Sequence, residues 1–169
     1  QLDAGADILD VGGESSRPGA NLVCGSEERT RVLPVISAIL DRRPKTVISI
    51  DTYRAETAAA AIDAGASIVN DIHALSADTE MPAAVAERKA AVVLMHNRSR
   101  SSAIRRDRRI GAEYKGVDYG DVIEEVAAEL RDGCARASDA GIIGERIAVD
   151  PGIGFGKSVL QNLALINHL

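Results

Sequence analysis

Short apolar runs rich in β-branched residues alternate with longer stretches of helical periodicity along this chain of 169 residues. Such short apolar runs are typical of strands that are buried on both faces of a sheet. Strand–helix alternation predicts a parallel sheet whose crossover connections are right-handed. The predicted strands cover residues 6–11, 46–50, 67–69, 91–95 and 146–149, and the predicted helices cover 27–40, 54–64, 81–89 and 121–140.

Residues that begin, break and end helices refine these boundaries. Ser26 is predicted to cap the first helix, and Pro34 is predicted to break it. Gly65 and Gly141 follow the second and fourth helices, in the position where a helix commonly ends on a left-handed residue. The spacing of the strands allows either a (β/α)8 barrel or an open doubly wound sheet.

Polar residues follow each apolar run, and this favours the barrel. A barrel gathers such groups from several strands onto one face, whereas an open sheet concentrates them at one switch point. The predicted fold class is therefore α/β, a (β/α)8 TIM barrel. The polar groups are the segment from Glu14 to Arg17, Asp51, Asn70, Asp71, His96, Asn97 and Asp150.

Charge and composition exclude several classes of function. The net charge of −5, with one Phe, three Tyr and no Trp, disfavours a nucleic-acid binder that stacks bases on aromatic rings. No apolar run reaches the roughly 18 residues of a membrane helix, and no signal-peptide pattern is present. Cys24 and Cys134 are isolated, which disfavours a disulfide framework and a zinc site and favours a reducing, cytoplasmic setting.

Arginines are concentrated in one segment, at positions 98, 100, 105, 106, 108 and 109. We interpret the segment from Arg98 to Arg109 as a solvated loop with one face of a helix. Binding of an acidic partner is the alternative.

The segment from Asp150 to Ser158 is rich in glycine and ends in Lys157-Ser158. It is not a P-loop, because Pro151 occupies the position of the first glycine, and the dinucleotide-binding spacing of glycines also fails. We favour a ligand-binding surface in which the glycines let a flat molecule approach the backbone. The alternative is a tight turn in which Asp150 caps backbone N–H groups.

Two further groups of residues have candidate chemistry. The segment from Gly12 to Gly19 places hydroxyls and Arg17 after a strand, so it could hold an anion; a surface loop is the alternative. Asp51, Asn70 and Asp150 present acceptors and a donor that match the edge of a heterocycle with several N–H groups.

These motifs resemble the dihydropteroate synthase family of pterin-binding barrels. They are GGESSRPGA at 12–20, SIDT at 49–52, IVNDI at 68–72, LMH at 94–96 and DPGIGFGK at 150–157. The resemblance implies condensation of 4-aminobenzoate with a dihydropterin pyrophosphate, which gives dihydropteroate and pyrophosphate in folate synthesis and is inhibited by sulfonamides. The partners would be these small molecules, with no nucleic acid or membrane.

The resemblance also implies roles for individual residues. Ser16 and Arg17 would lie on a loop that closes over aminobenzoate and pyrophosphate. Asn97 to Arg100 depart from the family pattern, so no role is transferred to them. The substrate-binding set is Ser16, Arg17, Asp51, Asn70, Ile72, Met95, Asp150 and Phe155, of which Arg17, Asp51 and Asp150 would be catalytic.

The matched motifs correspond to roughly strands 2 to 6 of eight, so residues 1–169 are expected to form a partial barrel domain. Segments 1–4 and 162–169 resemble a helix end and a helix start. The cofactor implied is Mg²⁺, with its asparagine ligand N-terminal to Gln1, and the parent enzyme is expected to be a homodimer. Two alternatives remain open: a folate-dependent methyltransferase domain, and an inactive fragment or degenerate paralogue that binds pterin or a protein. We expect the 169-residue chain to be inactive by itself.

Overall fold

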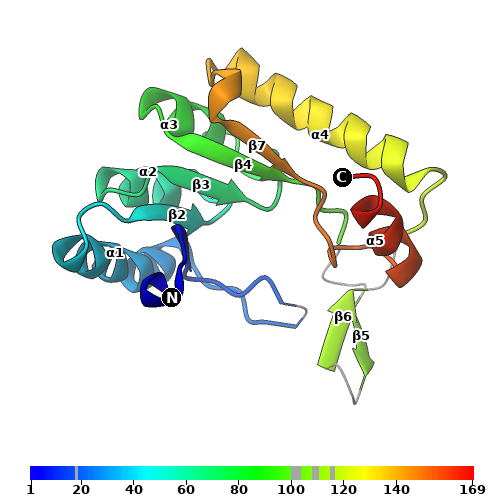
Figure 1. Ribbon diagram of the computed structural model, residues 1–169, viewed down its shortest axis with the longest axis horizontal. Coiled ribbons are helices and arrows are strands. Elements are labelled where there is room, and N and C mark those ends of the chain that lie inside the picture. Colours follow the sequence, from blue (N-terminus) through cyan, green and yellow to red (C-terminus); the bar gives the residue numbers. More distant parts are fainter. Residues whose placement is uncertain (18, 100–103, 108–110, 115–116) are drawn as a thin grey trace.

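Five parallel strands form a sheet in a computed structural model that describes residues 1–17, 19–99, 104–107, 111–114 and 117–169 (Figure 1). The strands follow one another in the order β1-β2-β3-β4-β7. They are β1 (Ile8–Gly12), β2 (Val47–Asp51), β3 (Ile68–Asp71), β4 (Ala91–Met95) and β7 (Ile147–Asp150).

The strand order decides between the two architectures that the sequence allowed. Each new strand of the sheet is added beside the previous one in the same direction, and the order never reverses. A doubly wound sheet reverses its order at a switch point, whereas a barrel does not. The arrangement is therefore that of a partial (β/α)8 barrel, as predicted.

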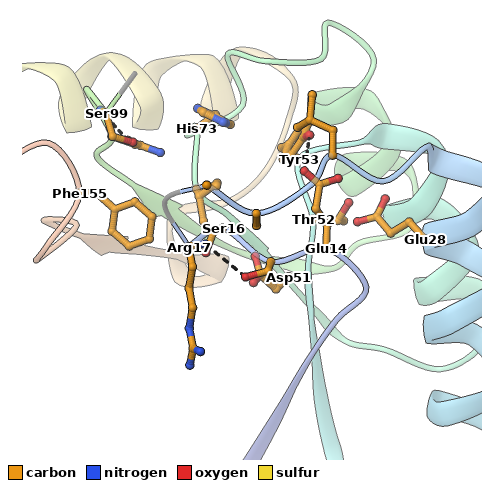
Figure 2. Close-up of a pocket in the computed structure, with 16 residues that line it drawn as sticks. Glu14, Ser16, Arg17, Glu28, Asp51, Thr52, Tyr53, His73, Ser99 and Phe155 are labelled. Carbon is orange, nitrogen blue, oxygen red and sulfur yellow. Dashed lines mark hydrogen bonds between the residues drawn. The ribbon is translucent and has the colours of Figure 1, made fainter. Parts of the chain in front are cut away.

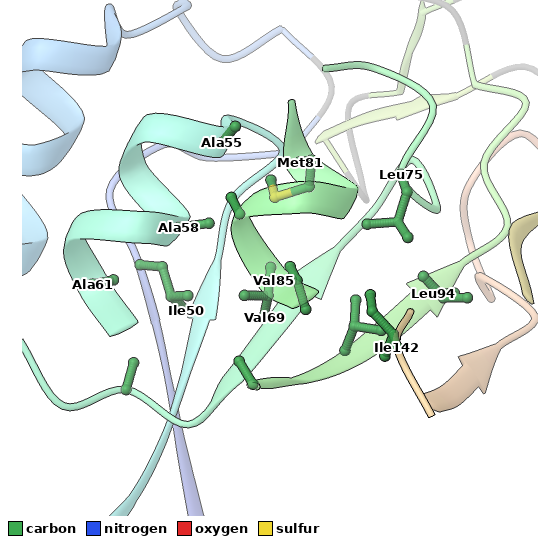
Figure 3. Close-up of a cluster of buried hydrophobic side chains, with 14 of the residues drawn as sticks. Ile50, Ala55, Ala58, Ala61, Val69, Leu75, Met81, Val85, Leu94 and Ile142 are labelled. Atoms are coloured by element: carbon green, nitrogen blue, oxygen red, sulfur yellow. The ribbon is translucent and has the colours of Figure 1, made fainter. Parts of the chain in front are cut away.

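Helices α1 (Gly25–Arg42), α2 (Ala55–Asp63), α3 (Met81–Glu87) and α4 (Val122–Asp139) pack along the sheet. The core lies between these helices and the strands. Alternate strand residues point into it, as the two-residue period of a strand requires. The core includes Ile36 of α1, Ile48 and Ile50 of β2, Val69 of β3, Met81 and Val85 of α3, and Leu94 of β4, several of which are drawn in Figure 3.

Two predictions about α1 were wrong. The backbone N–H of Glu28 donates to the carbonyl of Cys24, so the helix begins at Gly25 with Cys24 rather than Ser26 at its N-cap. Pro34 lies inside the helix and does not break it. Thr30 and Pro34 are both exposed, so water can solvate the carbonyl that loses its donor, while buried Val32 and Ile36 keep the helix on the sheet.

The prediction for the arginine-rich segment was also wrong in part. Strands β5 (Ile104–Asp107) and β6 (Gly111–Tyr114) form an antiparallel pair, not a helix face. Pairing lets each extended segment satisfy the backbone groups of the other. Arg100, Arg108 and Arg109 lie outside the described residues.

The two ends of the chain are helical, but with different bounds from those predicted. Residues Leu2–Ala4 form a 3-10 turn, and α5 covers Val159–Ile166. A capping box of Ser158 and Gln161 starts α5 earlier than the predicted residue 162. Cys24 and Cys134 are both free thiols. Within the described part of the chain, no helix is both long and apolar enough to cross a bilayer.

Candidate active site

The register of the sheet places three of the predicted polar residues, Asp51, Asn70 and Asp150, at one edge and on one face. Gly12, Asp51 and Asn70 are register partners on β1, β2 and β3, and Met95 and Asp150 are partners on β4 and β7. Register partners in a parallel sheet point to the same side, which here is the face opposite the helices. The carboxyl ends of the strands therefore present these side chains together.

A cavity of about 310 Å³ lies over this edge. Its walls include five of the eight predicted substrate-binding residues, which are Ser16, Arg17, Asp51, Ile72 and Phe155. In the view of Figure 2, Asp51 lies between Phe155 on one side and the pair Glu14 and Tyr53 on the other. The structure thus gathers residues that are up to 139 positions apart in the sequence into one cavity, counting from Ser16 to Phe155 (155 − 16 = 139).

The other three predicted residues lie beside this cavity rather than in its wall. The Asn70 side-chain amide donates to the Asp10 carboxylate (3.3 Å). Met95 borders a second cavity of about 180 Å³. One oxygen of Asp150 accepts a hydrogen bond from the backbone N–H of Gly152 (2.7 Å), so the turn-capping interpretation of Asp150 is confirmed.

Asp51 is the most perturbed carboxylate of the cavity. Burial, together with the negative charges of Asp10, Glu28, Asp71 and Glu14, raises its pKa from 3.8 to about 6. A carboxylate in this state gains from any ligand that brings N–H donors or positive charge. Perturbed acids in a cleft are common at functional sites.

The glycine-rich segment forms a turn that lies against the loop after β4. Gly152 has a φ of +67°, and a side chain there would place its Cβ 1.9 Å from the carbonyl oxygen of His96. The Lys157 ammonium is buried and donates to the carbonyls of Gly152 (2.9 Å), Phe155 (3.1 Å) and His96 (3.4 Å). Burial lowers the Lys157 pKa to about 8. The turn thereby holds Phe155 at the cavity wall.

Sequence reasoning missed several residues of the cavity wall. Thr52 and Tyr53 follow Asp51 directly, and His73 packs edge-on against the Tyr53 ring with centroids 5.3 Å apart. Asn97 and Ser99 also line the cavity, although they depart from the family pattern. Their position just after the strands β2, β3 and β4 was the available signal, because loops at this end of a barrel form the site.

Comparison with known proteins agrees with this geometry. The family described as "pterin binding enzyme" matches residues 1–169. The chain belongs to the pterin-binding enzyme family. It is 41% identical to the dihydropteroate synthase of Clostridium beijerinckii over 99% of the chain and 56% of that protein.

Solved structures of pterin-binding enzymes show the same fold. The Xanthomonas albilineans dihydropteroate synthase with 4-aminobenzoic acid superposes with a TM-score of 0.86 and 39% identity, over 99% of this chain and 55% of that one. The Burkholderia cenocepacia enzyme complexed with 7,8-dihydropteroate gives a TM-score of 0.83 and 38% identity, over 98% and 55%. The chain thus spans little more than half the length of these relatives.

The Mg²⁺ ion implied by the resemblance stays a prediction, because its expected asparagine ligand lies N-terminal to Gln1. Among residues 1–17, 19–99, 104–107, 111–114 and 117–169, no three His, Cys, Asp or Glu side chains come together as a metal site. Mg²⁺ is usually bound by one or two protein ligands together with substrate phosphates and water, so its binding does not require such a cluster. We therefore assign no step of the chemistry to a metal held by these residues.

Proposed function

We propose that the protein containing this chain is a dihydropteroate synthase, which condenses 4-aminobenzoate with a dihydropterin pyrophosphate. The observation that carries the proposal is the cavity between the Ser16–Arg17 segment and Asp51 at the carboxyl ends of the strands. Its two sides suit the two parts of the substrate, since one offers a guanidinium for the pyrophosphate and the other offers carboxylates for the N–H groups of the pterin. The relatives whose names give this activity support it.

Each side of the cavity has a separate task in this proposal. The carboxylates of Asp51 and Asp150 accept hydrogen bonds from the edge of the pterin, and the Asn70 amide accepts and donates hydrogen bonds there. The apolar faces of the pterin pack against Ile72, Met95 and Phe155. Asp51 serves in its ionised form, because the raised pKa of about 6 leaves it deprotonated at neutral pH. Ser16 and Arg17 bind the pyrophosphate and orient the incoming amine.

The bond changes require positioning and charge rather than a covalent intermediate. The bond between the pterin methylene carbon and the pyrophosphate oxygen breaks, and both of its electrons leave with the pyrophosphate. Arg17 stabilises the negative charge that develops on the leaving group, and Asp51 and Asp150 stabilise the positive charge on the methylene and ring. The amine nitrogen of 4-aminobenzoate then bonds to the methylene carbon and loses a proton, which passes to water. Holding the two substrates in line supplies much of the rate.

The test is release of pyrophosphate by the natural full-length protein with both substrates present. Asp150→Asn should weaken pterin pyrophosphate binding at least about tenfold, because the neutral amide loses a charged acceptor of a buried ligand. Asp139→Asn, an exposed change on α4, is the matched control and should bind and turn over like the unchanged protein. Unchanged turnover of Asp150→Asn would sink the assignment.

The same assay separates the alternatives. A folate-dependent methyltransferase domain would bind a pterin but release no pyrophosphate. A degenerate paralogue would bind the pterin, or a protein, and release nothing. Two further parts of the proposal are a cytoplasmic location, which the two free thiols favour, and a homodimeric parent enzyme.

A further inference from the structure

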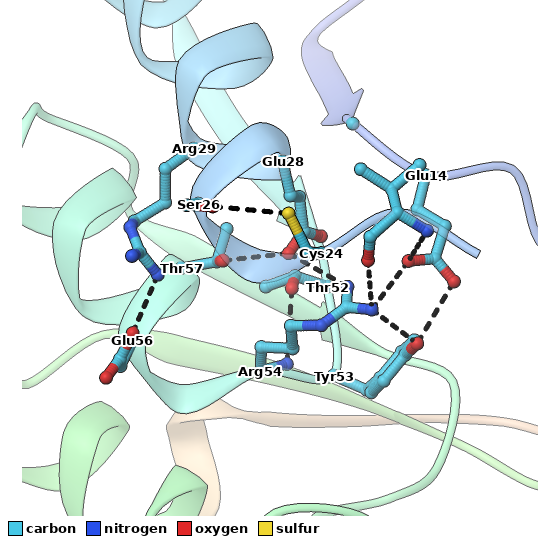
Figure 4. Close-up of polar contacts among 12 residues, drawn as sticks. Glu14, Cys24, Ser26, Glu28, Arg29, Thr52, Tyr53, Arg54, Glu56 and Thr57 are labelled. Atoms are coloured by element: carbon cyan, nitrogen blue, oxygen red, sulfur yellow. Dashed lines mark hydrogen bonds and ion pairs between the residues drawn. The ribbon is translucent and has the colours of Figure 1, made fainter.

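The loop between β1 and α1 is fastened at both of its ends by one side chain from outside it. Glu14 lies near the start of this loop and Val23 lies near its end. The Glu14 carboxylate accepts a hydrogen bond from the backbone N–H of Val23 (3.3 Å). One guanidinium nitrogen of Arg54, Nη2, donates both to that carboxylate (2.7 Å) and to the Val23 carbonyl (2.7 Å). Figure 4 shows the hydrogen bonds that join this guanidinium to Glu14 and to the Tyr53 hydroxyl.

Arg54 is itself held in place by two further residues, Glu28 and Tyr53. Its Nη1 donates to Glu28 of α1 (3.0 Å), and Glu28 is 1% exposed and also accepts from the Thr57 hydroxyl (2.8 Å). The guanidinium carbon lies 4.5 Å from the centroid of the Tyr53 ring, and the Tyr53 hydroxyl donates to Glu14 (3.0 Å). We call Arg54, Glu14, Glu28 and Tyr53 the Arg54 network. Its geometry leaves the guanidinium little freedom to move.

Charge and shape in the network favour one arrangement of the loop. Burial by itself would raise the Glu14 pKa, but the hydrogen bonds from Arg54 and Tyr53 lower it, so Glu14 is ionised at neutral pH. Gly13 passes directly over Glu28, and a Cβ there would come within 2.9 Å of the Glu28 side chain. The start of the loop therefore packs against the side chain of the same glutamate that anchors Arg54.

We infer that Arg54, acting through Glu14 and Val23, positions Ser16 and Arg17 for 4-aminobenzoate and so determines how well that substrate is bound. The inference rests on the proposed function. Ser16 and Arg17 lie between the two fastened ends and line the cavity with Glu14. Arg54 itself does not line that cavity; it is a positioning residue and acts only through the loop.

The first variant is Arg54→Lys in the natural full-length protein. Lysine keeps a cation beside buried Glu28 but lacks the planar fork that bridges Glu14 and Val23. We expect the KM for 4-aminobenzoate to rise about tenfold through loss of charge-assisted hydrogen bonds. The Kd for the dihydropterin without its pyrophosphate, measured by calorimetry, should stay within about twofold, because Asp51, Asn70 and Asp150 lie outside this loop. An equal loss for 4-aminobenzoate and for this pterin, or an unchanged KM, would overturn the inference.

Two controls keep the result interpretable. Arg29→Lys alters the exposed ion pair of Arg29 with Glu56 (2.8 Å), which joins α1 to α2. This ion pair does not involve the loop between β1 and α1. This variant should leave both constants unchanged. Glu14→Ala removes the loop anchor without leaving Glu28 unpaired, so it should raise the same KM even if Arg54→Lys folds poorly.

Amide hydrogen exchange separates failure of this inference from failure of the proposed function. If the unchanged protein releases no pyrophosphate, the proposed function is wrong whatever the loop does. The Val23 amide and those of residues 19–22 should still exchange about tenfold faster in Arg54→Lys than in Arg29→Lys. Equal exchange in the two variants would show that Arg54 does not fasten the loop.

Discussion

The loops after β1 and β7 border the same cavity, but the protein fastens them by different means. The loop after β1 is held by the Arg54 network, in which a guanidinium meets two carboxylates and a tyrosine. The turn after β7 is held by the ammonium of Lys157, which is 5% exposed and donates to three backbone carbonyls. One loop is fixed through side chains and the other through its backbone.

The difference explains where the sequence needs particular residues. A network of opposite charges depends on every partner, because removing one leaves a buried charge unpaired. A turn held through carbonyls depends instead on backbone shape, and Gly152 has a positive φ that brings it against the His96 carbonyl. The first loop is therefore expected to be sensitive to charge, and the second to the volume of a single side chain.

Breaking the charge network should have the largest effect on stability. Arg54→Met leaves the Glu28 carboxylate buried and, within the described part of the chain, with the Thr57 hydroxyl as its one remaining hydrogen-bond partner. The free energy of unfolding, measured by urea denaturation, should fall by about 3–5 kcal/mol. Arg88→Met breaks the surface pair of Arg88 with Asp63 and should cost less than about 1 kcal/mol. Equal losses in the two variants would show that the Arg54 network stabilises no more than a surface pair.

Adding one methyl group to the turn after β7 should have the next largest effect. Gly152→Ala places a Cβ 1.9 Å from the His96 carbonyl oxygen at a φ of +67°, so unfolding free energy should fall by roughly 3 kcal/mol. Gly154→Ala is the matched control, since it also has a positive φ but open space around it, and should cost about 1 kcal/mol. A difference close to zero between these variants would contradict the close approach of the two loops.

Removing the ammonium tests whether the backbone-held turn is the weaker of the two. Lys157→Met takes the donor from three carbonyls, so we expect a loss of about 2 kcal/mol by urea denaturation. Lys45→Met, on the exposed connection before β2, should have little effect. A loss as large as that of Arg54→Met would remove the distinction between the two loops.

The smallest effect should be a gain in stability at the acidic side of the cavity. The pKa of Asp51 is raised from 3.8 to about 6 in the folded protein. Its contribution to folding is therefore full below pH 3.8 and is lost as the pH rises through 6. At pH 7, Asp51→Asn should raise the free energy of unfolding by about 1–2 kcal/mol.

The gain should shrink towards zero as the pH is lowered below 3.8, where Asp51 becomes protonated in both states. Thermal or urea denaturation at a series of pH values checks the sign. Pterin binding should fall in the same variant, as expected where a functional group is kept at a cost in stability. If Asp51→Asn stabilised the protein less at pH 7 than at pH 4, this result would contradict the raised pKa of Asp51.

Much of the fold could be predicted from local pattern. The apolar runs predicted all five strands of the sheet, and Gly65 and Gly141 mark the helix ends with positive φ. The positions of Asp51 and Asn70 at strand ends were enough to place them at one edge, because parallel strands share their direction. The motifs that follow the strands were enough to indicate the family.

The errors came from features that depend on surroundings. Pro34 was predicted to break α1, but the packing of Val32 and Ile36 on the sheet outweighs one lost hydrogen bond. Pairing of β5 with β6 depends on two segments meeting, which charge alone does not indicate. The start of α5 could have been found, since Ser158 and Gln161 have the spacing of a capping box.

The sequence by itself determined the kind of architecture, the family and the set of polar groups at the strand ends, because these depend on periodicity and on residues close together in the chain. Tertiary structure alone decided how the two cavity loops are held. Arg54 meets Glu14 across 40 positions, and Lys157 meets the His96 carbonyl across 61. Such contacts leave no local pattern, since they form only when packed strands and helices bring distant residues within hydrogen-bonding distance.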